Sequence, residues 1–569
     1  MQNTKTSAIP WLIAKIKRYI PGVFLLAILN AVLAYSYIDL ALLSETIIDA
    51  ATALIKTDTI TQASDLLRLP ELYVPALRIA GVILLQIVLT IACASVRVRV
   101  NGYIDIRLRQ SLFDALMGKE YEQFHHYHSG ELMNRLTSDI TNVSSGVTNL
   151  IPSAVSMATK LIGGLIVLTR ISPVFTAVLV GAGLILLLCS RVYGRFSKRL
   201  HKACQETEGK TRSFMQESLA NLLSIKAFSN EPYIEERLMR YQRDNLHMRI
   251  KRNTVSNVGH TAIFFLLNGA YYLALVWGAV CLVGGTLSFG TLTALLQIFQ
   301  QLKLPLRNAS SLMPQYYAML ASAERLHELE FLYDEEEAID EATKTQLHSS
   351  FRAITVRDLS FAYEGEAPVL EQTNVTLKKG EVVVLMGESG AGKSTLMKLI
   401  LSILRPLSGS MQVECEEREF PLNASVRCLF SYVPQGNAVL AGTLRENVAF
   451  FRHDVSDEQI MEALRLACLE GFVDSLPEGL DTMLGERGFD LSEGQAQRIA
   501  IARALVNEAP VLLLDECTSA LDEKTESRLL KNIKGMTDKT VLMISHRNAA
   551  VDGCDRIWRL QDKRIVDSE

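Results

Sequence analysis

The stretch Met386–Leu396 reads MGESGAGKSTL, and it decides the fold of the second half of this 569-residue chain. The run EVVVLM, residues 381–386, reads as a buried strand, and the pattern G-x-x-x-x-G-K-S follows from Gly387 to Ser394. A strand, a glycine-rich loop and a helix in this order let backbone N–H groups and the positive helix end face a phosphate. The segment therefore predicts a loop that binds the phosphates of ATP.

The residues of this loop have separate predicted tasks. Its glycines let the backbone approach the phosphates without side-chain collision. The ammonium of Lys393 can reach the β and γ phosphates, and the hydroxyl of Ser394 can bind Mg²⁺. The predicted nucleotide-binding residues here are Gly387, Glu388, Ser389, Gly390, Ala391, Gly392, Lys393, Ser394 and Thr395.

Two further apolar strands end in residues that suit ATP hydrolysis. The first, PVLLL at 510–514, precedes Asp515 and Glu516. Asp515 would bind Mg²⁺, and Glu516 would act as general base on the water that attacks the γ-phosphate. The alternative is an acidic strand end that caps a helix. The second strand, VLMIS at 541–545, ends in His546, which by itself reads as a structural histidine.

The long apolar runs of the chain lie before about Pro314. A membrane-spanning helix needs about 20 mostly apolar residues. The charged segments between the second and third runs and between the fourth and fifth keep a 3.6-residue apolar period, which predicts helices that continue beyond the membrane. The six predicted spans are residues 20–43, 74–96, 150–170, 173–194, 257–283 and 287–312.

Basic residues predict the orientation of these spans. The stretch Arg191–Arg252 carries 14 Lys and Arg residues, whereas Ser44–Val74 carries only Lys56 and Arg68. Because basic loops stay in the cytoplasm, both termini of a six-span chain are expected there, in a multi-pass protein of the cell membrane. The stretch Trp11–Tyr19 suits an amphipathic helix on the cytoplasmic face.

Composition excludes several other classes of protein. The net charge of −4 gives no basic field for nucleic acid, so none is expected as a partner. The nine cysteines form no CxxC pair, which favours buried thiols over a zinc site or a disulfide framework.

Further motifs of the second half resemble those of ATP-binding cassette (ABC) proteins. Leu491–Gln495 reads LSEGQ and resembles their signature motif, usually LSGGQ. Gly485–Gly488 resembles the X-loop of exporters, and Ser519–Asp522 resembles the D-loop. Gln435 stands where a Q-loop glutamine is expected, and Tyr363 where an aromatic A-loop residue is expected.

The first half resembles the membrane domain of ABC exporters. Phe124–Asp139 is similar to their first intracellular loop, Gly284–Leu292 to the turn before their sixth helix, and Ala321–Arg325 to the exit from it. The resemblance implies a half-transporter, with an all-α transmembrane domain of six helices and an α/β P-loop nucleotide-binding domain. The implied boundaries are 1–325 for the membrane domain, 326–350 for a linker and 351–569 for the nucleotide-binding domain.

The resemblance also implies that two chains, head to tail, share each ATP. Tyr363 would stack on adenine, and Ser492, Gly494 and Gln495 would come from the opposite chain. His546 becomes a catalytic residue, and Gln435 both a catalytic residue and a metal ligand. The implied catalytic residues are Glu516, His546 and Gln435, and the implied Mg²⁺ ligands are Ser394, Gln435 and Asp515.

The partner is either a second copy of this chain or a paralogous half-transporter. Glu493 replaces the usual first glycine of the signature, and its carboxylate would repel a triphosphate if it pointed inward. We expect it to point to solvent, with weakened second-site function in a heterodimer as the alternative. Two cytoplasmic turns, Lys119–Ser129 and Gln216–Asn230, are predicted to transmit motion between the nucleotide-binding domain and the membrane domain. We call them the first and second levers.

The predicted function is ATP-driven export of an amphipathic drug, lipid or peptide by alternating access, in contact with membrane lipids. An exporter-fold importer and an ATP-gated regulatory subunit of a heterodimer are the alternatives. Lys160 is a lone ammonium within a predicted span, so it must face a cavity or a partner, for which Asp39 is one candidate.

Overall fold

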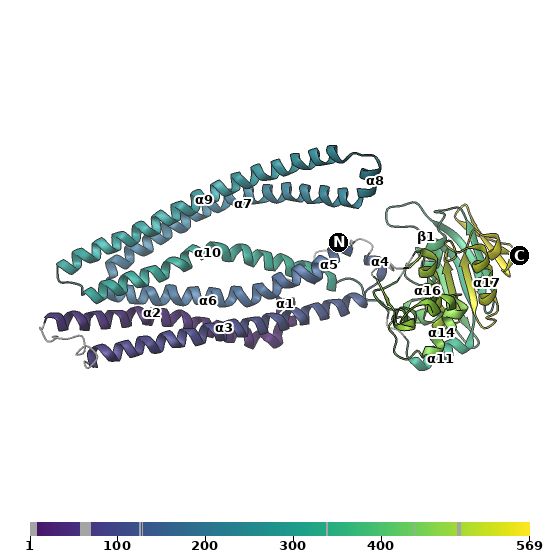
Figure 1. Cartoon of the computed structure of the whole chain (residues 1–569), viewed down its shortest axis with the longest axis horizontal. Coiled ribbons are helices and arrows are strands. Elements are labelled where there is room, and N and C mark those ends of the chain that lie inside the picture. The colour runs from purple at the N-terminus through teal and green to yellow at the C-terminus, as the bar shows by residue number, and fades with distance from the viewer. Residues whose placement is uncertain are drawn as a thin grey trace. The chain divides into compact units, whose positions relative to one another are not determined.

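The computed structural model describes residues 8–56, 70–124, 127, 129–336, 339–436, 439–485 and 491–568 (Figure 1). The chain forms two compact units. Unit 1 comprises Met1–Ala115 and Ser129–Phe331, and unit 2 comprises Leu116–His128 and Leu332–Glu569.

Long helices make up the described part of unit 1 (Figure 1), and each predicted span lies on one of them. They are α2 (Ile20–Lys56), α3 (Pro70–Met117), α6 (Ile140–Ile171), α7 (Pro173–Ala220), α9 (Glu231–Val283) and α10 (Phe289–Glu330). Shorter helices accompany them, namely α1 (Ala8–Ile16), η1 (Lys17–Tyr19), α5 (Ser129–Asn134), the π-helix η3 (Arg135–Asp139) and α8 (Leu222–Ala227).

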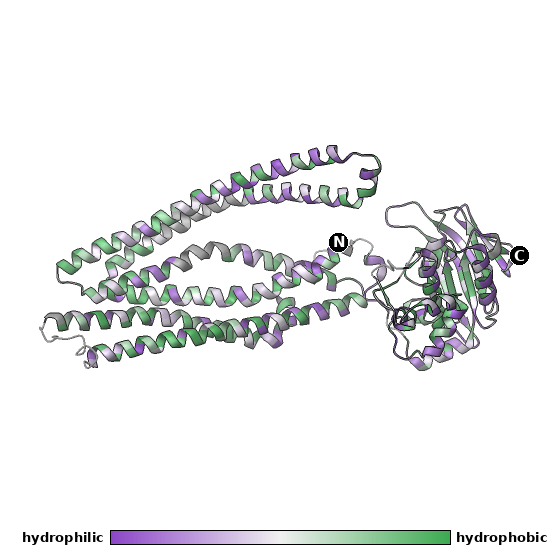
Figure 2. Cartoon of the chain, in the orientation of Figure 1, coloured by the Kyte–Doolittle hydropathy of each residue, from purple (hydrophilic) through white to green (hydrophobic). Residues whose placement is uncertain are grey.

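Four helical stretches of the described chain are long and apolar enough to cross a membrane, namely Ala8–Leu54, Pro70–Met117, Gly130–Ile171 and Glu231–Val283. The other two predicted spans lie on α7 and α10, where some side chains are outside the described set. Large apolar side chains point outward on α3, where Leu84 is 64% and Ile91 is 63% exposed. Apolar residues are spread along these helices (Figure 2), as expected for helices that face lipid.

Small residues bring α6 close to its neighbours. A Cβ atom added at Gly163 would lie 2.6 Å from the side chain of Ile38 on α2. A Cβ atom at Gly164 would lie 2.8 Å from Leu302 on α10. Since lipid gives helices no hydrophobic reason to associate, such close contacts supply van der Waals attraction instead.

Carboxylates of α2 hold the first turn of α10. Asp49 accepts hydrogen bonds from the backbone N–H of Gly290 (2.8 Å) and the hydroxyl of Ser288 (2.6 Å). The hydroxyl of Thr291 donates to Glu45 (2.8 Å). Negative groups at a helix N-terminus satisfy its free N–H groups and favour its dipole, so these bonds fasten α10 to α2.

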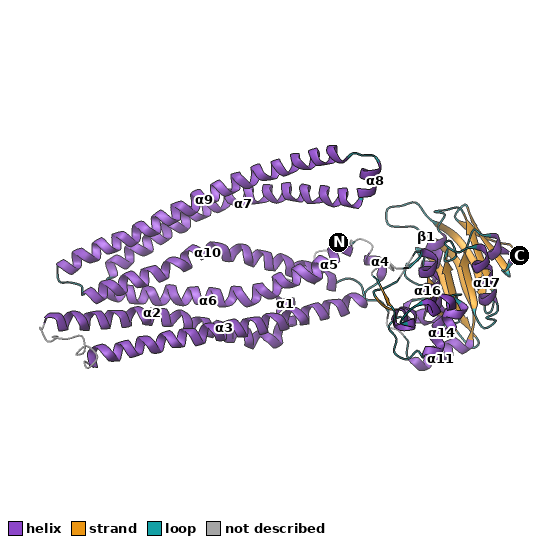
Figure 3. Cartoon of the chain, viewed as in Figure 1, coloured by secondary structure: helices purple, strands orange, loops and turns teal. Residues whose placement is uncertain are grey.

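Unit 2 contains a six-stranded sheet in the order β12-β11-β3-β10-β9-β6 and a four-stranded antiparallel sheet in the order β2-β1-β4-β5 (Figure 3). The central strand β10 (Thr540–Ile544) pairs in parallel with β3 (Val382–Gly387) and β9 (Val511–Asp515). The remaining strands are β1 (Phe351–Phe361), β2 (Leu370–Lys378), β4 (Ser408–Cys415), β5 (Glu419–Pro421), β6 (Phe430–Val433), β7 (Gly442–Thr443), β8 (Met483–Leu484), β11 (Arg556–Gln561) and β12 (Arg564–Ser568).

Helices pack around these sheets and bury two apolar clusters. Within the range predicted as a linker, residues 341–350 form α11, whose Leu347 is buried in the first cluster. The helices are α4 (Tyr121–Phe124), α11 (Glu341–Ser350), α12 (Lys393–Ile400), η4 (Ala424–Leu429), α13 (Leu444–Ala449), α14 (Asp457–Leu466), α15 (Glu470–Ser475), η5 (Gly479–Asp481), α16 (Glu493–Val506), α17 (Glu523–Lys534) and α18 (Asn548–Asp552).

The junction of α2 and α10 gives a test of packing in unit 1. A Cβ atom at Gly290 would lie 2.4 Å from the backbone oxygen of Glu45, which cannot move aside easily. We expect Gly290→Ala to destabilise the purified protein by about 1–3 kcal/mol, as overpacking does. Thermal unfolding in detergent would measure this as a lower midpoint.

Gly81→Ala on α3 is the matched control, because nothing lies within 4 Å of its added Cβ atom. Equal midpoints for the two variants would contradict the α2–α10 contact.

Candidate nucleotide-binding site

Parallel pairing brings the predicted site residues to one sheet edge. Ile544 at the end of β10 pairs with Leu385 of β3 and with Asp515 of β9. The loops after these three strands therefore meet, and ligands of parallel α/β sheets bind at such carboxyl ends.

The glycine-rich loop after β3 has backbone angles that favour glycine. Gly390 and Gly392 have φ angles of +79° and +110°. A Cβ atom at Gly392 would also lie 2.4 Å from Val369. Both constraints explain the glycine at position 392, directly before α12 begins at Lys393.

Lys393 occupies the centre of this loop. Its side chain is buried, and its ammonium donates to the carbonyl oxygens of Gly387 and Glu388, both at 2.8 Å. The loop thus holds the Lys393 ammonium at its centre, close to the backbone N–H groups, and both kinds of donor suit a phosphate.

Asp515 is buried (1% exposed) beside Ser394. The Ser394 hydroxyl donates to one carboxylate oxygen (3.1 Å) and the Tyr432 hydroxyl donates to the other (3.4 Å). Burial raises the pKa of Asp515, and the nearby charge of Glu516 raises it further. Burial and the Asp515 charge also raise the pKa of Tyr432, which keeps its hydroxyl protonated as a donor.

Glu516 gathers the other predicted catalytic residues. The Gln435 amide donates to Glu516 Oε2 at 2.8 Å, and His546 Nε2 lies 3.8 Å from Glu516 Oε1. Glu516 has a φ angle of +48°, and its backbone N–H donates to Ile544 at the end of β10. The left-handed conformation turns the chain out of β9 at the carboxylate, and strained residues of this kind gather at functional sites.

Tyr363, the residue predicted to stack on adenine, lies near α12. The Tyr363 hydroxyl is 3.2 Å from the Thr395 hydroxyl on α12. Its ring meets that of Phe361 edge-on at a centroid distance of 5.0 Å. These contacts fix the ring beside the first turn of α12.

The signature residues lie at the start of α16. Ser492 is the N-cap and forms a capping box with Gln495. Glu493 is exposed, and Gly494 approaches the backbone of Ala520, because a Cβ atom there would lie 3.0 Å from its oxygen. Among the described residues, no hydrogen bond joins Ser492 or Gln495 to the glycine-rich loop. The predicted X-loop, beyond Gly485, lies outside the described residues.

Gln497 and Arg547 are two site residues that the sequence motifs do not identify. Gln497 exchanges hydrogen bonds with Ser519 (2.9 Å) and Ala520 (3.1 Å). Arg547 donates to the carbonyl oxygens of Leu521 (2.9 Å) and Ser519 (2.7 Å) and also pairs with Glu526. The two side chains hold the predicted D-loop in place. The one sequence signal for either residue is that Arg547 directly follows His546.

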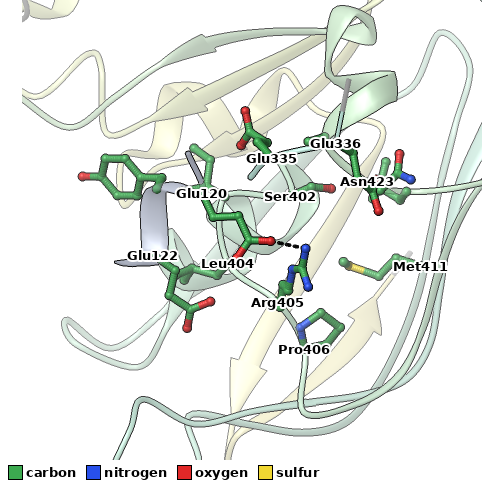
Figure 4. A pocket seen from close by; sticks show the side chains of 14 residues that line it. Glu120, Glu122, Glu335, Glu336, Ser402, Leu404, Arg405, Pro406, Met411 and Asn423 are labelled. Atoms are coloured by element: carbon green, nitrogen blue, oxygen red, sulfur yellow. Dashed lines mark ion pairs between the residues drawn. The ribbon is translucent and has the colours of Figure 1, made fainter. Parts of the chain in front are cut away.

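Part of the first predicted lever belongs to unit 2. The Lys119 ammonium pairs with Asp334 (2.6 Å), and the Glu120 backbone N–H donates to the Tyr333 carbonyl (3.1 Å). Glu120 also pairs with Arg405 at the edge of a cavity of about 90 Å³ (Figure 4). The turn after α3 is therefore fastened to the nucleotide-binding unit by charge.

Comparisons with known proteins match both halves of the chain. Residues 11–306 match the model of the ABC transporter transmembrane region, and residues 370–519 match that of the ABC transporter. The chain belongs to the ABC transporter family. The two matches confirm the predicted family and fold class and show that unit 2 is a nucleotide-binding ABC ATPase domain in a membrane protein.

Several curated relatives are similar to this ABC transporter. ABC transporter B family member 1 of Dictyostelium discoideum is 31% identical over 81% of this chain, which spans 50% of that protein. The mitochondrial potassium channel ATP-binding subunit of Xenopus tropicalis is 30% identical over 88% of this chain and 73% of its own length. The ATP-dependent lipid A-core flippase of Syntrophus aciditrophicus is 29% identical over 81% and 76%.

A solved structure shows the same fold. A bacterial Atm1-family ABC exporter with ATP bound has a TM-score of 0.78 at 21% identity and covers 97% of this chain and 94% of its own. The half-transporter architecture, one membrane domain with one nucleotide-binding domain, implies that the chain dimerises.

Gly392 offers a test of the loop. We expect Gly392→Ala to weaken ATP binding at least tenfold, because an alanine meets both the unfavourable φ angle and the Val369 side chain. Equilibrium binding of a fluorescent ATP analogue would measure the loss. Gly471→Ala on α15, where nothing lies within 4 Å, is the control, and unchanged affinity in Gly392→Ala would contradict the assignment.

Proposed function

We propose that this chain is an ATP-driven exporter of an amphipathic substrate (drug, lipid or peptide) that works by alternating access as a dimer in the cell membrane. Both termini face the cytoplasm in this proposal, as the basic residues of 191–252 favour. The observation that carries it is the assembly of Glu516, Gln435 and His546 at the carboxyl edge of the parallel sheet. A subunit that only bound ATP would not need this trio.

Each ATP is shared by two chains in the proposed dimer. One chain contributes the loop Gly387–Thr395, and the opposite chain contributes Ser492, Gly494 and Gln495 from the start of α16. The capping box of Ser492 and Gln495 fixes the start of α16. The other backbone N–H groups of its first turn have no partner within the helix and are therefore available to a phosphate, which supports this arrangement. ATP then joins the two chains, and hydrolysis releases them.

The residues around Asp515 fit a Mg²⁺ ion. The buried Asp515 carboxylate, the Ser394 hydroxyl and the side-chain oxygen of Gln435 would supply oxygen ligands, which Mg²⁺ prefers. Burial raises the pKa of Asp515, and a cation beside it would favour the charged form. When bound, the ion neutralises charge that develops on the phosphates.

The residues of the trio have distinct proposed roles. Glu516 accepts a proton from the attacking water as general base. Gln435 donates to Glu516 Oε2 and so orients the carboxylate. His546 lies beside Glu516 Oε1, where it would contact the γ-phosphate. Lys393 stabilises the phosphates from the loop.

The second lever, around α8, supports domain coupling through the partner chain. Leu223 (84% exposed) and Phe228 (77% exposed) leave a small apolar surface at the end of the α7–α9 pair. We place this surface against the nucleotide-binding domain of the opposite chain.

The general base gives the first test of the proposal. We expect Glu516→Gln to lower steady-state ATP hydrolysis by at least 100-fold, the usual contribution of a general base, with ATP affinity unchanged. Phosphate release by the purified protein would measure it. The exposed Glu523→Gln of α17 should hydrolyse ATP at the wild-type rate, and a Glu516→Gln variant as fast as this control would refute the role.

Complementation tests the shared site. Lys393→Ala disables the loop and Ser492→Arg disables the signature, so each homodimer should fail to trap nucleotide with vanadate. A mixed dimer keeps one complete site, formed by the loop of the Ser492→Arg chain and the signature of the Lys393→Ala chain. We expect trapping to return to about half the wild-type level; no return would contradict sharing.

Direction is tested in inside-out vesicles that contain wild-type protein or Glu516→Gln. With Mg-ATP, the wild type should accumulate a fluorescent amphiphile and the variant should not. Loss of preloaded amphiphile instead would establish import.

A further inference from the structure

The chain passes between unit 1 and unit 2 at three places, after Ala115, before Ser129 and after Phe331. The first passage lies in the last turn of α3, and the third directly follows α10. We call residues 332–336, at the third passage, the strap. They lie in the range that the sequence predicted as a linker, and a flexible linker would transmit little movement.

The strap pairs with the turn after α3 through backbone groups. The Glu120 N–H donates to the Tyr333 carbonyl oxygen (3.1 Å), and the Glu335 N–H donates to the Gly118 carbonyl oxygen (2.9 Å). The Tyr333 N–H also donates to the side chain of Gln123 (2.8 Å). The two segments thus form a short antiparallel ladder, which joins the first and third passages to each other within unit 2.

An ion pair closes the same ladder. Lys119 and Asp334 lie opposite each other in it, and their side chains meet at 2.6 Å. The Lys119 side chain is 5% exposed and that of Asp334 is 82% exposed. Because a buried ammonium is costly without an anion, the Asp334 carboxylate favours the closed strap.

The next residue of the strap connects it to the phosphate loop. The Glu335 carboxylate accepts two hydrogen bonds from the Arg427 guanidinium on η4 (2.8 and 3.0 Å). The same guanidinium donates to the carbonyl oxygens of Leu401 (2.9 Å) and Ser402 (3.0 Å), which directly follow α12. Since α12 begins at Lys393, one short helix separates these carbonyl groups from the predicted phosphate site.

The geometry of these contacts suits the transfer of a displacement. A guanidinium that meets both oxygens of a carboxylate has a fixed orientation. Its bonds to carbonyl groups at the end of α12 are favoured by the helix dipole. Glu335 and Ser402 also line the same cavity (Figure 4). A shift of α12 would therefore move Arg427 and, with it, the strap.

We propose that the strap carries the effect of ATP binding from the phosphate loop to the ends of α3 and α10 of the same chain. The route runs through α12, Arg427 and Glu335 to the ladder with the turn after α3. It is separate from the second lever, which we place against the opposite chain. This inference rests on the proposed coupling of ATP hydrolysis to export and names residues of one chain that provide it.

Hydrogen exchange, followed by mass spectrometry, tests the route in the full-length protein in nanodiscs. Glu516→Gln is the parent, because it is expected to keep ATP bound. With Mg-ATP, we expect exchange in the parent to slow by about threefold or more, both in the phosphate loop and in residues 118–122. When Glu335→Gln is added, the phosphate loop should keep this protection and residues 118–122 should lose it.

Glu341→Gln, added to the same parent, is the matched control. Glu341 lies on α11 of unit 2, its side chain is 80% exposed, and it pairs with Lys344. Both ATP effects should be unchanged in this control. An ATP effect at residues 118–122 that persists in Glu335→Gln, or that is absent from the parent, would overturn the proposal.

Asp334→Asn keeps the test decisive if Glu335→Gln misfolds, because the Asp334 side chain is exposed. It should also remove the ATP effect at residues 118–122, and persistence of that effect would then overturn the proposal. Failure of the export function is a different result, since no cargo enters this experiment. It would appear as wild-type protein that hydrolyses ATP but accumulates no amphiphile in vesicles.

Discussion

The parallel pairing of β10 with β3 and β9 is the constraint on which the site depends. It brings the glycine-rich loop to the same edge as Asp515 and His546, although the loop precedes both by more than 100 residues in the sequence. Apolar residues of these same strands lie in both core clusters of unit 2, so the packing of the core also positions the site. A substitution that shifted β10 by one residue would displace His546 from Glu516 and turn each apolar side chain of β10 to the other face of the sheet.

Unit 1 is held together by other means. Exposed apolar side chains line its predicted spans, so lipid does not drive these helices together, and close approach at Gly163 and Gly164 does so instead. Polar contacts add specificity, such as the carboxylate of Asp49 on the first turn of α10. Among the described residues, Lys160 has no carboxylate within ion-pair distance, and its Nζ atom lies over the Tyr37 ring instead.

Local patterns in the sequence predicted much of this structure. Glycine spacing and apolar runs were enough for the loop, the strand ends and the long helices, because each depends on neighbouring residues. The roles of Gln497 and Arg547 could not be predicted, since they act through carbonyl and hydroxyl groups of a distant loop. Asp39 was only one candidate partner for Lys160 in the sequence. In the structure the Lys160 Nζ atom lies 4.8 Å from the centre of the Tyr37 ring, and Asp39, two residues after Tyr37, leaves α2 on nearly the opposite side.

The central claim is that ATP lies between two chains. The most direct measurement is an electron cryo-microscopy structure of Glu516→Gln in nanodiscs with Mg-ATP. The account predicts two nucleotides in a dimer, each held by Lys393 of one chain and Ser492 of the other. A nucleotide that contacts Lys393 and Ser492 of the same chain, or a monomer with ATP fully enclosed, would contradict it.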